Sequence, residues 1–307
     1  MHILVIKPSS LGDIVHGLQV AAIMKKHMSG LQIDWVARDC FADIVAASGI
    51  VEHTHLFHRA TGISTFFKLL KAIRSRRYDA VLDMQGLARS GLMTCAAKAA
   101  RKIGRCDSRE LSRIFYGERI GKSDSPHALD TLLQFLPKFG IMPSFEYALN
   151  FGTIENLCNF AEQYVLLFPE SRRVEKQWPF FRELAEELAA AYPKLKIVLL
   201  GQNSIGWKFT RGNILDLMGK TSLLDTLGLI KHCALVVAND SAPIHIGAAM
   251  QKRIVALFGP TDFRKYGPYP LNCTRHSVLS RRALKELSVK NVFDACTIQS
   301  DNFLHSC

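Results

Sequence analysis

The 307-residue sequence lacks the long apolar runs of a membrane protein. No stretch approaches the roughly 18 consecutive apolar residues that a membrane-spanning helix requires, because Lys25 and Lys26 end the longest N-terminal run. A secretory signal is not expected either, since Lys7, Pro8 and Asp13 interrupt the apolar start within a few residues. We therefore expect a cytoplasmic protein, with enough apolar residues (48 % of the chain) to build two cores.

Motifs of several cofactor-dependent classes are also missing. No Gly-x-Gly-x-x-Gly and no complete Gly-x-x-x-x-Gly-Lys-Ser/Thr loop is present, which argues against a dinucleotide oxidoreductase and a P-loop enzyme. None of the eight cysteines forms a Cys-x-x-Cys pair, so neither a zinc site nor a disulfide framework is expected. Three histidines, His53, His55 and His58, lie close together, but on a strand His58 faces away from the other two. We expect no metal there.

Acidic residues are scarce relative to basic ones. The 39 Lys and Arg against 27 Asp and Glu give a net charge of +12, which attracts nucleic acid, anionic lipid surfaces or phosphorylated substrates. No stacking-aromatic or helix-turn-helix signature supports nucleic acid, so we do not expect it as a partner. Lys68, Lys71 and Arg74 step by three along one predicted helix, and Arg59 precedes it. This row either contacts an anionic glycolipid or the inner leaflet of a membrane, or is an ordinary solvated helix face.

Segments with strand-like and helix-like spacing alternate along the chain. In the first half, strands are predicted at 2–6, 32–36, 55–57, 80–83 and 102–104, with helices between them. After a turn-rich stretch at 143–153, strands are predicted at 164–168, 196–200, 235–238 and 254–258, and helices at 180–192, 222–232 and 241–250. This alternation predicts two doubly wound parallel sheets, in domains 1–150 and 151–307. We expect a last helix at 289–295 to pack back across the domain junction.

Ligands bind such folds at the carboxyl ends of the strands, and the first strand-end loop is Lys7-Pro-Ser-Ser-Leu-Gly-Asp13. Ser10 and Asp13 have the spacing of a capping box, in which each satisfies an amide at the helix start. Asp13 at a helix N-terminus would also stay ionised and act as general base for an alcohol, with Gly12 leaving room for the substrate. The spacing alone favours the capping role.

The second loop, Asp83-Met-Gln-Gly-Leu-Ala-Arg-Ser90, also connects a strand to a helix. It is either a glycine turn with exposed polar residues, or a loop in which Gln85 and Arg89 reach an anionic acceptor. The residues of this loop do not decide between the two.

The third loop runs from Ser171 to Pro179 and contains Arg172, Arg173 and Lys176 before Trp178-Pro179. Four donors in six residues at a strand end favour a phosphate clamp over a solvated face. Trp178 fits a packing anchor, and proline suits a first helical turn.

The fourth loop, Asn239-Asp240-Ser241-Ala-Pro-Ile-His245, begins a helix and lies before a second loop, Gly259-Pro-Thr-Asp262. Its polar residues supply a helix cap. A helix N-terminus with a serine hydroxyl beside a second glycine loop is also a good diphosphate site. His245, one turn into the helix, fits either a core position or this site.

In this order the motifs resemble the lipopolysaccharide heptosyltransferases of glycosyltransferase family 9. The matching segments are Lys-x-Ser-Ser-x-Gly-Asp, Gln-Gly-Leu, Lys-x-Trp-Pro, Asn-Asp-Ser-x-x-x-His and Phe-Gly-Pro-Thr-Asp, between residue 3 and about residue 270. The resemblance implies a GT-B fold, with two Rossmann-like domains that face each other across a cleft. It also implies transfer of heptose from ADP-heptose to a lipopolysaccharide inner-core acceptor of the lipid A–Kdo type, with inversion and without a metal or other cofactor.

The resemblance assigns roles to residues at the strand ends. Asp13 matches the catalytic base, and Lys176 matches a residue that holds the donor diphosphate and supports catalysis. The expected donor-binding residues are Ser171, Arg172, Asp240, Ser241, Ala242, His245, Gly259, Pro260 and Thr261. The expected acceptor-binding residues are Ser10, Gly12, Arg59, Gln85 and Arg89.

Two positions depart from the family pattern. Ala242 stands where the family usually has glycine, and the segment 202–215 contains no carboxylate where family members carry a nucleoside-binding Glu. The identity of the donor nucleotide is therefore open. The alternatives are a family member that uses another nucleotide-sugar or acceptor, and a catalytically silent relative that binds anionic glycans or membranes.

Overall fold

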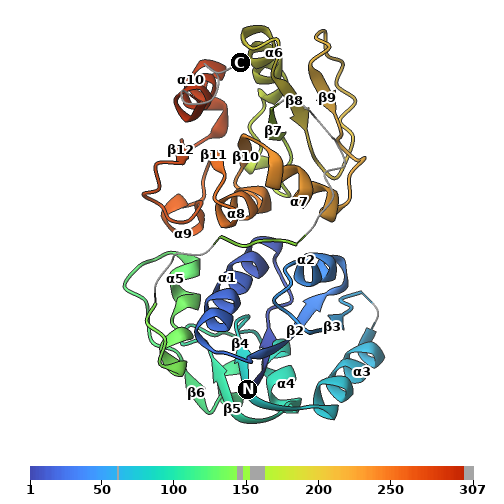
Figure 1. The fold of residues 1–307 in the computed structure, drawn as a ribbon, viewed down its shortest axis with the longest axis vertical. Coiled ribbons are helices and arrows are strands. Elements are labelled where there is room, and N and C mark those ends of the chain that lie inside the picture. Colours follow the sequence, from blue (N-terminus) through green and yellow to red (C-terminus); the bar gives the residue numbers. More distant parts are fainter. Residues whose placement is uncertain (61, 144–147, 153–162, 301–307) are drawn as a thin grey trace. The chain divides into compact units, whose positions relative to one another are not determined.

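The computed structural model describes residues 1–60, 62–143, 148–152 and 163–300 (Figure 1). The chain divides into two compact units, Met1–Gly152 and Thr153–Cys307. The boundary predicted after residue 150 lies two residues before this division. Within the predicted linker 143–153, residues 144–147 and 153 lie outside the described residues. No helix in the described ranges combines the length and apolar character needed to cross a bilayer.

Unit 1 contains a six-stranded parallel sheet in the order β3-β2-β1-β4-β5-β6. Its strands are β1 (His2–Ile6), β2 (Gln32–Arg38), β3 (His53–Phe57), β4 (Arg77–Asp83), β5 (Lys98–Gly104) and β6 (Glu118–Arg119). Its helices are α1 (Leu11–His27), α2 (Ala42–Ala47), α3 (Gly62–Ser75), α4 (Ala88–Ala96) and α5 (Ala128–Leu133), with 3-10 turns η1 (Asp39–Phe41), η2 (Ser112–Phe115) and η3 (Leu136–Phe139).

The helices of unit 1 cover both faces of the sheet, as Figure 1 shows. The chain moves outward from β1 to β3 and then returns to β4, so right-handed crossovers place α1 and α2 on one face and α3 and α4 on the other. Leu69 and Ile73 of α3 and Met93 of α4 share one apolar core with Leu4 and Ile6 of β1. Helices on both faces explain why β1 is a nearly continuous apolar run.

Unit 2 repeats the arrangement, with the sheet order β12-β11-β10-β7-β8-β9. Its strands are β7 (Tyr164–Phe168), β8 (Lys196–Leu199), β9 (Ile214–Asp216), β10 (Leu235–Asn239), β11 (Arg253–Phe258) and β12 (His276–Ser280). Its helices are α6 (Phe181–Ala191), α7 (Leu223–His232), α8 (Ala242–Ala249), α9 (Phe263–Tyr266) and α10 (Val289–Ser300), with 3-10 turns η4 (Val174–Lys176) and η5 (Leu284–Glu286).

Each sheet has a topological switch point. In unit 1 the strands that follow β1 are added toward one edge of the sheet, and those that follow its neighbour β4 are added toward the other edge. In unit 2 the same holds for β7 and β10. Ligands of doubly wound sheets bind beyond the carboxyl ends of such strand pairs. The loops that contain Asp13 and Gln85 follow β1 and β4, and those that contain Ser171 and Asp240 follow β7 and β10.

The predicted doubly wound parallel sheets are confirmed, and all nine predicted strands are present. Three further strands, β6, β9 and β12, were not predicted, because they are short or only half buried and show no apolar run. The connection from β8 to β9 contains no helix, which shortens unit 2 relative to the expected alternation. Helix α10 packs on α6 and on β10, β11 and β12 of its own unit. Packing across the junction stays a prediction.

Candidate active site

Asp13 lies in the first turn of α1, just beyond β1. Its Oδ2 accepts hydrogen bonds from the Ser10 hydroxyl at 2.6 Å and the Ser10 amide at 3.0 Å. The Lys7 ammonium is 3.6 Å from Oδ1, and the Asp13 side chain remains 39 % exposed. The carboxylate therefore binds the helix start and still faces solvent, so both roles considered from the sequence are compatible with its geometry.

The electrostatics of this corner keep Asp13 ionised. Burial acts to raise its pKa, but the Lys7 charge and the two Ser10 hydrogen bonds outweigh this and lower the pKa of Asp13 to about 2. The Lys7 side chain is only 3 % exposed, and its burial lowers the pKa of the ammonium. A nearly buried cation beside a half-open carboxylate is a local arrangement that the Lys-x-Ser-Ser-x-Gly-Asp motif did not by itself reveal.

The loop after β4 is shaped by Asp83. This fully buried carboxylate accepts from the amides of Gln85 at 3.0 Å and Gly86 at 2.9 Å, and from the Tyr116 hydroxyl at 2.8 Å. Burial raises the pKa of Asp83. Gly86 has a φ of 73°, a left-handed conformation that favours glycine. Asp83 thus fixes the backbone that presents Gln85.

Arg105 and Ser108, beyond the end of β5, complete this corner and were missed by the sequence analysis. The Arg105 guanidinium pairs with Asp107 at 2.6 Å and interacts electrostatically with Asp13. The Ser108 Oγ and the Gln85 Oε1 are buried and have no hydrogen-bond partner among the described residues. Unpartnered polar atoms beside cations make this corner a candidate site for a polar acceptor. The available signal was the position of Arg105 directly after a predicted strand.

The remaining expected acceptor residues are less closely grouped. Gly12 is buried in the first turn of α1, next to Asp13. Arg59 is exposed beyond the edge strand β3, and Arg89 is exposed in the first turn of α4. Within the described part of the chain, neither guanidinium makes a hydrogen bond or ion pair with Asp13.

In unit 2 the central contact joins the third and fourth loops. Lys176 Nζ in η4 is 2.5 Å from Asp240 Oδ2, directly beyond β10. The side chains are 16 % and 7 % exposed. Each charge compensates the other in this poorly solvated position, and Asp240 fixes where the Lys176 ammonium points.

Asn239 holds these loops together, a role that the sequence analysis did not assign. Its Nδ2 donates to the Pro169 carbonyl at 2.7 Å, and its Oδ1 accepts from the Trp178 amide at 3.0 Å. The Trp178 indole donates to the Leu287 carbonyl at 2.9 Å. The segment that contains Lys176 is therefore fixed on both sides.

The phosphate clamp expected of the third loop stays a prediction. Arg173 is paired with Glu175, with Nε 2.7 Å from Oε1, and its side chain is 62 % exposed. Arg172 is exposed. The Ser171 carbonyl accepts from the Gln177 amide group at 2.7 Å, which closes the loop on itself. The spacing of two residues between Arg173 and Glu175 allows this local ion pair.

The start of α8 also differs from the predicted cap. Ser241 stands at the N-cap position, but its hydroxyl donates to the Asn239 carbonyl at 3.1 Å instead of accepting from a helix amide. Ala242 is the first residue of α8, and His245 is half-buried within its first turn. The first amides of this helix thus have no side-chain cap, which suits anion binding.

The glycine loop after β11 lies against the third loop. A Cβ at Gly259 would come within 3.1 Å of the Glu175 carbonyl, a tight contact, so glycine favours this close approach. Pro260 is exposed and Thr261 half-buried. These residues and the Lys176–Asp240 pair lie in neighbouring loops of one unit.

A carboxylate does contact the loop after β8, although the segment 202–215 itself contains none. Glu170, two residues beyond β7, accepts from the amides of Gln202 at 2.5 Å and Asn203 at 3.2 Å, and from the Asn203 side-chain amide at 2.9 Å. Gly201 leaves room for it, since a Cβ there would lie 2.6 Å from Glu170 Oε2.

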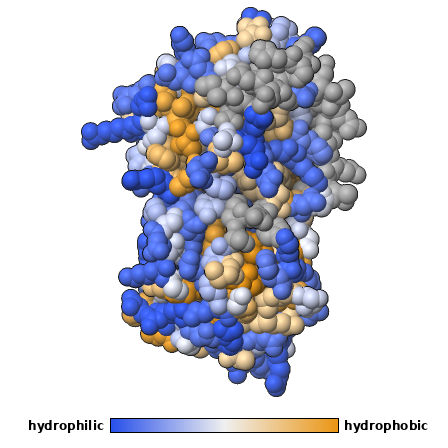
Figure 2. Space-filling model, turned by 60° about the vertical axis from the view of Figure 1, so that its left-hand side comes forward, coloured by the Kyte–Doolittle hydropathy of each residue, from blue (hydrophilic) through white to orange (hydrophobic). Residues whose placement is uncertain are grey.

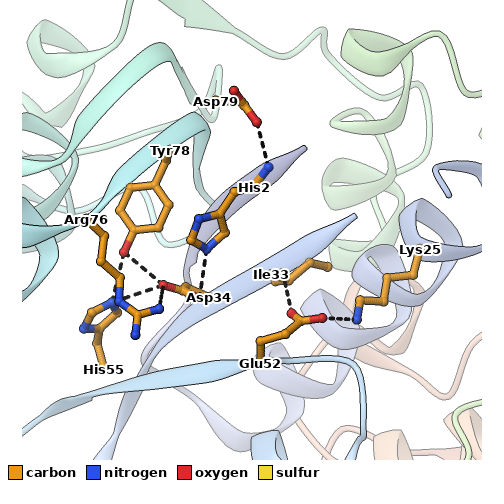
Figure 3. A network of polar contacts seen from close by, with 9 residues as sticks. All are labelled: His2, Lys25, Ile33, Asp34, Glu52, His55, Arg76, Tyr78 and Asp79. Atoms are coloured by element: carbon orange, nitrogen blue, oxygen red, sulfur yellow. Dashed lines mark hydrogen bonds and ion pairs between the residues drawn. The ribbon is translucent and has the colours of Figure 1, made fainter. Parts of the chain in front are cut away.

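A second polar cluster lies at the amino ends of the strands of unit 1, shown in Figure 3. Asp34 is fully buried and contacts His2 Nε2 at 3.0 Å, the Arg76 guanidinium at 3.0 Å and the Tyr78 hydroxyl at 3.1 Å. His55 Nε2 lies 3.6 Å away. Burial acts to raise the pKa of Asp34, but the hydrogen bonds of His55 and His2 and the charge of Arg76 outweigh this and lower it. The cluster ties four strands together.

The three neighbouring histidines, two in β3 and His58 just beyond it, separate in the structure. The rings of His53 and His55 meet edge to face at 4.6 Å, whereas His58 pairs with Asp39 at 2.9 Å. Among the described residues, no group of three or more His, Cys, Asp and Glu side chains is arranged to hold a metal ion.

Comparison with known proteins identifies the family. The model of glycosyltransferase family 9 (heptosyltransferase) matches residues 66–296. The lipopolysaccharide core heptosyltransferase OpsX of Haemophilus influenzae is 25 % identical, over 92 % of this chain and 86 % of that protein. Lipopolysaccharide heptosyltransferase 1 of Escherichia coli O18:K1:H7 is 24 % identical, over 97 % of this chain and 100 % of that protein.

Solved structures agree in fold. E. coli heptosyltransferase WaaC with ADP has a TM-score of 0.82 at 24 % identity and covers 97 % of this chain and 100 % of that chain. The glycosyltransferase family 9 structure from Veillonella parvula has a TM-score of 0.82 at 18 % identity and covers 100 % of this chain and 97 % of that chain. The fold is therefore GT-B. On the match of the family model and these relatives, the chain belongs to glycosyltransferase family 9, the lipopolysaccharide heptosyltransferase family, and is a glycosyltransferase.

Proposed function

We propose that the protein transfers heptose from ADP-heptose to an inner-core lipopolysaccharide acceptor of the lipid A–Kdo type, at the cytoplasmic face of the inner membrane. The relatives named above are lipopolysaccharide heptosyltransferases, and E. coli WaaC has been solved with ADP and with ADP-2-deoxy-2-fluoro heptose. The observation that carries the proposal is the ionised, half-exposed Asp13 carboxylate beyond β1.

In the proposed mechanism Asp13 is the general base. It takes the proton of the acceptor hydroxyl while that oxygen attacks the anomeric carbon of the donor, which inverts the configuration. The acceptor is assigned to the corner of Gln85 and Ser108, whose side-chain oxygens lack a hydrogen-bond partner among the described residues, with the Arg105 charge nearby. Lys7 holds Asp13 ionised and in place.

Lys176 acts on the departing nucleoside diphosphate. Negative charge grows on the diphosphate as the glycosidic bond breaks, and the Lys176 ammonium and the first amides of α8 stabilise it. Asp240 holds the ammonium in position. These groups supply positive charge of the kind that a divalent cation supplies in other transferases, so we propose that the transfer proceeds without a bound metal.

A second candidate is transfer from another nucleotide-sugar, and Glu170 is the observation that favours it. Its carboxylate accepts hydrogen bonds from the backbone amides of Gln202 and Asn203. It comes from the loop after β7, whereas the family pattern places a nucleoside-binding Glu within the loop after β8. The nucleoside would then be read by other groups of unit 2.

Thermal shifts with ADP, UDP, GDP and CMP distinguish the two candidates. A ligand at a hundred times its Kd stabilises the protein by about 2.7 kcal/mol. Stabilisation by ADP but not by the other nucleotides supports ADP-heptose, whereas stabilisation by UDP alone contradicts it. Turnover with ADP-heptose should then be unaffected by EDTA, and Asp13→Asn should lower kcat by about a hundred- to ten-thousandfold. Unchanged turnover in Asp13→Asn would refute the assigned base.

A further inference from the structure

The outer side of α3 exposes apolar and basic side chains in one row. Ile63 and Phe67 are one helical turn apart, and they are 77 % and 61 % exposed. Lys71 and Arg74 continue the row with helical spacing, and both are exposed. The opposite side of the helix packs in the core of unit 1. The outward row is therefore not needed for folding.

A second exposed apolar pair lies beside η2. Leu111 is 73 % exposed and Ile114 is 68 % exposed, and the exposed Arg109 and Arg113 flank them. Leu111 has a φ of 60°, a left-handed conformation that residues other than glycine rarely adopt. The backbone thus holds a large apolar side chain toward solvent at a conformational cost.

Both sets of side chains lie on the same side of unit 1. Helix α3 contacts α4, and α4 contacts η2. Leu92 of α4, the helix that contacts both elements, is 42 % exposed. Figure 2 turns the left-hand side of Figure 1 forward, and on the face that it shows hydrophobic patches interrupt a mostly hydrophilic surface. Helix α3 is at the right-hand side of Figure 1, so these patches are not those of α3.

The same part of the chain carries most of the net charge. Residues 53–114, which include α3, α4 and η2, contain 13 Lys and Arg and four acidic residues, Asp79, Asp83, Asp107 and Glu110. Asp83 is fully buried, Asp107 pairs with Arg105, and Glu110 accepts from the Ala88 amide. The excess of basic over acidic residues in this part of the chain attracts anions.

We propose that this face docks unit 1 on an anionic lipid bilayer. It is called here the α3–η2 face and comprises Ile63, Phe67, Lys71, Arg74, Leu111 and Ile114. Single exposed apolar residues are ordinary, but two pairs that lie on one side among arginines and lysines match an interfacial surface, with apolar side chains at the acyl boundary and cations at the head groups. This inference rests on the proposed function, because a glycolipid acceptor lies in a bilayer and the enzyme must reach it there.

The test uses the full-length protein and vesicles. Co-sedimentation with phosphatidylethanolamine vesicles that contain 30 % phosphatidylglycerol is compared with co-sedimentation with pure phosphatidylcholine vesicles. Binding to the anionic vesicles should exceed binding to the neutral ones, and it should weaken as salt rises from 50 to 500 mM. Absence of wild-type binding to the anionic vesicles overturns the proposal.

Two double variants locate the surface. Lys71→Gln/Arg74→Gln should weaken partition onto anionic vesicles roughly thirtyfold. Arg282→Gln/Lys285→Gln removes two exposed cations of unit 2 and is the matched control, with an expected change of less than about threefold. Equal losses in both variants would show that net charge alone, and not the α3–η2 face, drives binding.

The apolar part of the row has its own pair of variants. Ile63→Ser/Phe67→Ser should weaken vesicle binding by at least about tenfold. The control is Met142→Ser/Leu224→Ser, at residues 81 % and 36 % exposed elsewhere in the chain. Because all four residues are exposed, circular dichroism and Tm should be unchanged. Unaltered vesicle binding by Ile63→Ser/Phe67→Ser overturns the assigned surface, as does a wild-type dimer in sedimentation that this variant abolishes.

Activity separates this proposal from the proposed function. With a soluble, deacylated acceptor the Ile63→Ser/Phe67→Ser variant should keep wild-type turnover, and with acceptor embedded in vesicles it should lose most of it. No turnover of ADP-heptose by the wild type would refute the proposed function and leave the vesicle result standing. Equal turnover of variant and wild type on embedded acceptor would refute the docking surface alone.

Discussion

Replacement of Lys7 by methionine tests whether the charge of Lys7 sets the protonation of Asp13. Methionine fills the nearly buried space of the side chain without its charge. The Lys7→Arg variant keeps a cation there and is the control. The assay is the ¹³C chemical shift of the Asp13 carboxyl, titrated from pH 6 to pH 3 and assigned by its loss in Asp13→Asn.

The expected shift follows from the distance between the charges. At 3.6 Å two unit charges attract by about 1 kcal/mol in water and about 4.6 kcal/mol at an effective dielectric constant of 20. Since Asp13 is 39 % exposed, solvent screening favours the lower part of this range, about 1–3 kcal/mol. At 1.36 kcal/mol per unit, the pKa of Asp13 rises from about 2 to roughly 3–4 in Lys7→Met.

The sign of the stability change can be checked in the same variants. Because the folded-state pKa of Asp13 lies below its unfolded value, its stabilising effect is present above about pH 4 and is lost as the pH falls toward 2. The stability of Lys7→Met should therefore depend less steeply on pH between pH 4 and pH 2 than that of the wild type. A folded Lys7→Met protein whose Asp13 does not titrate above pH 3 would refute the reasoning.

Four further variants probe polar contacts within the two units. Asp34→Ala leaves the buried Tyr78 and His55 without their carboxylate, and we expect a loss of about 3–5 kcal/mol in the free energy of unfolding by urea; a loss under 1 kcal/mol would contradict this. Tyr116→Phe removes a donor from Asp83 and should raise KM for the acceptor more than KM for the donor, in steady-state kinetics; equal changes would count against Asp83 as a positioning residue. Asp240→Asn should weaken ADP binding about tenfold in calorimetry because Lys176 loses its fixed orientation, and Lys176→Met should weaken it further; unaltered binding in both would remove this pair from the donor site.

The fold could be predicted where strands are buried on both faces. β1 and β7 are continuous apolar runs, and their predicted bounds agree with the structure. β9 and β12 lie at the sheet edges and are only partly buried, so burial imposes no apolar pattern on them. Edge strands form because a neighbouring strand offers a row of hydrogen-bonding groups. The residues of the edge strand itself do not show which strand will be its neighbour.

The site could be predicted at the level of single loops. Asp13 and Lys176 follow strand ends, and residues in such positions point to ligands in a doubly wound sheet. Their partners were harder to predict, because they depend on tertiary packing. Asn239 bridges residues 70 and 61 positions away, and neither distance is visible in the spacing of a motif. Arg173, in contrast, was satisfied by a carboxylate only two residues away.

Glu170 shows why reading one loop at a time fails in this fold. The segment after β8 contains no carboxylate, and a search within 202–215 therefore finds none. β7 and β8 are parallel neighbours, so their carboxyl ends meet at one edge of the sheet, and the residue that follows β7 can serve the loop that follows β8. Glu170 does so across 32 positions of sequence and binds the amide of Gln202. A functional group expected in one loop of a parallel sheet should therefore also be sought at the ends of the neighbouring strands. Whether such a carboxylate can bind a ligand then depends on how many of its oxygens already accept hydrogen bonds from backbone amides.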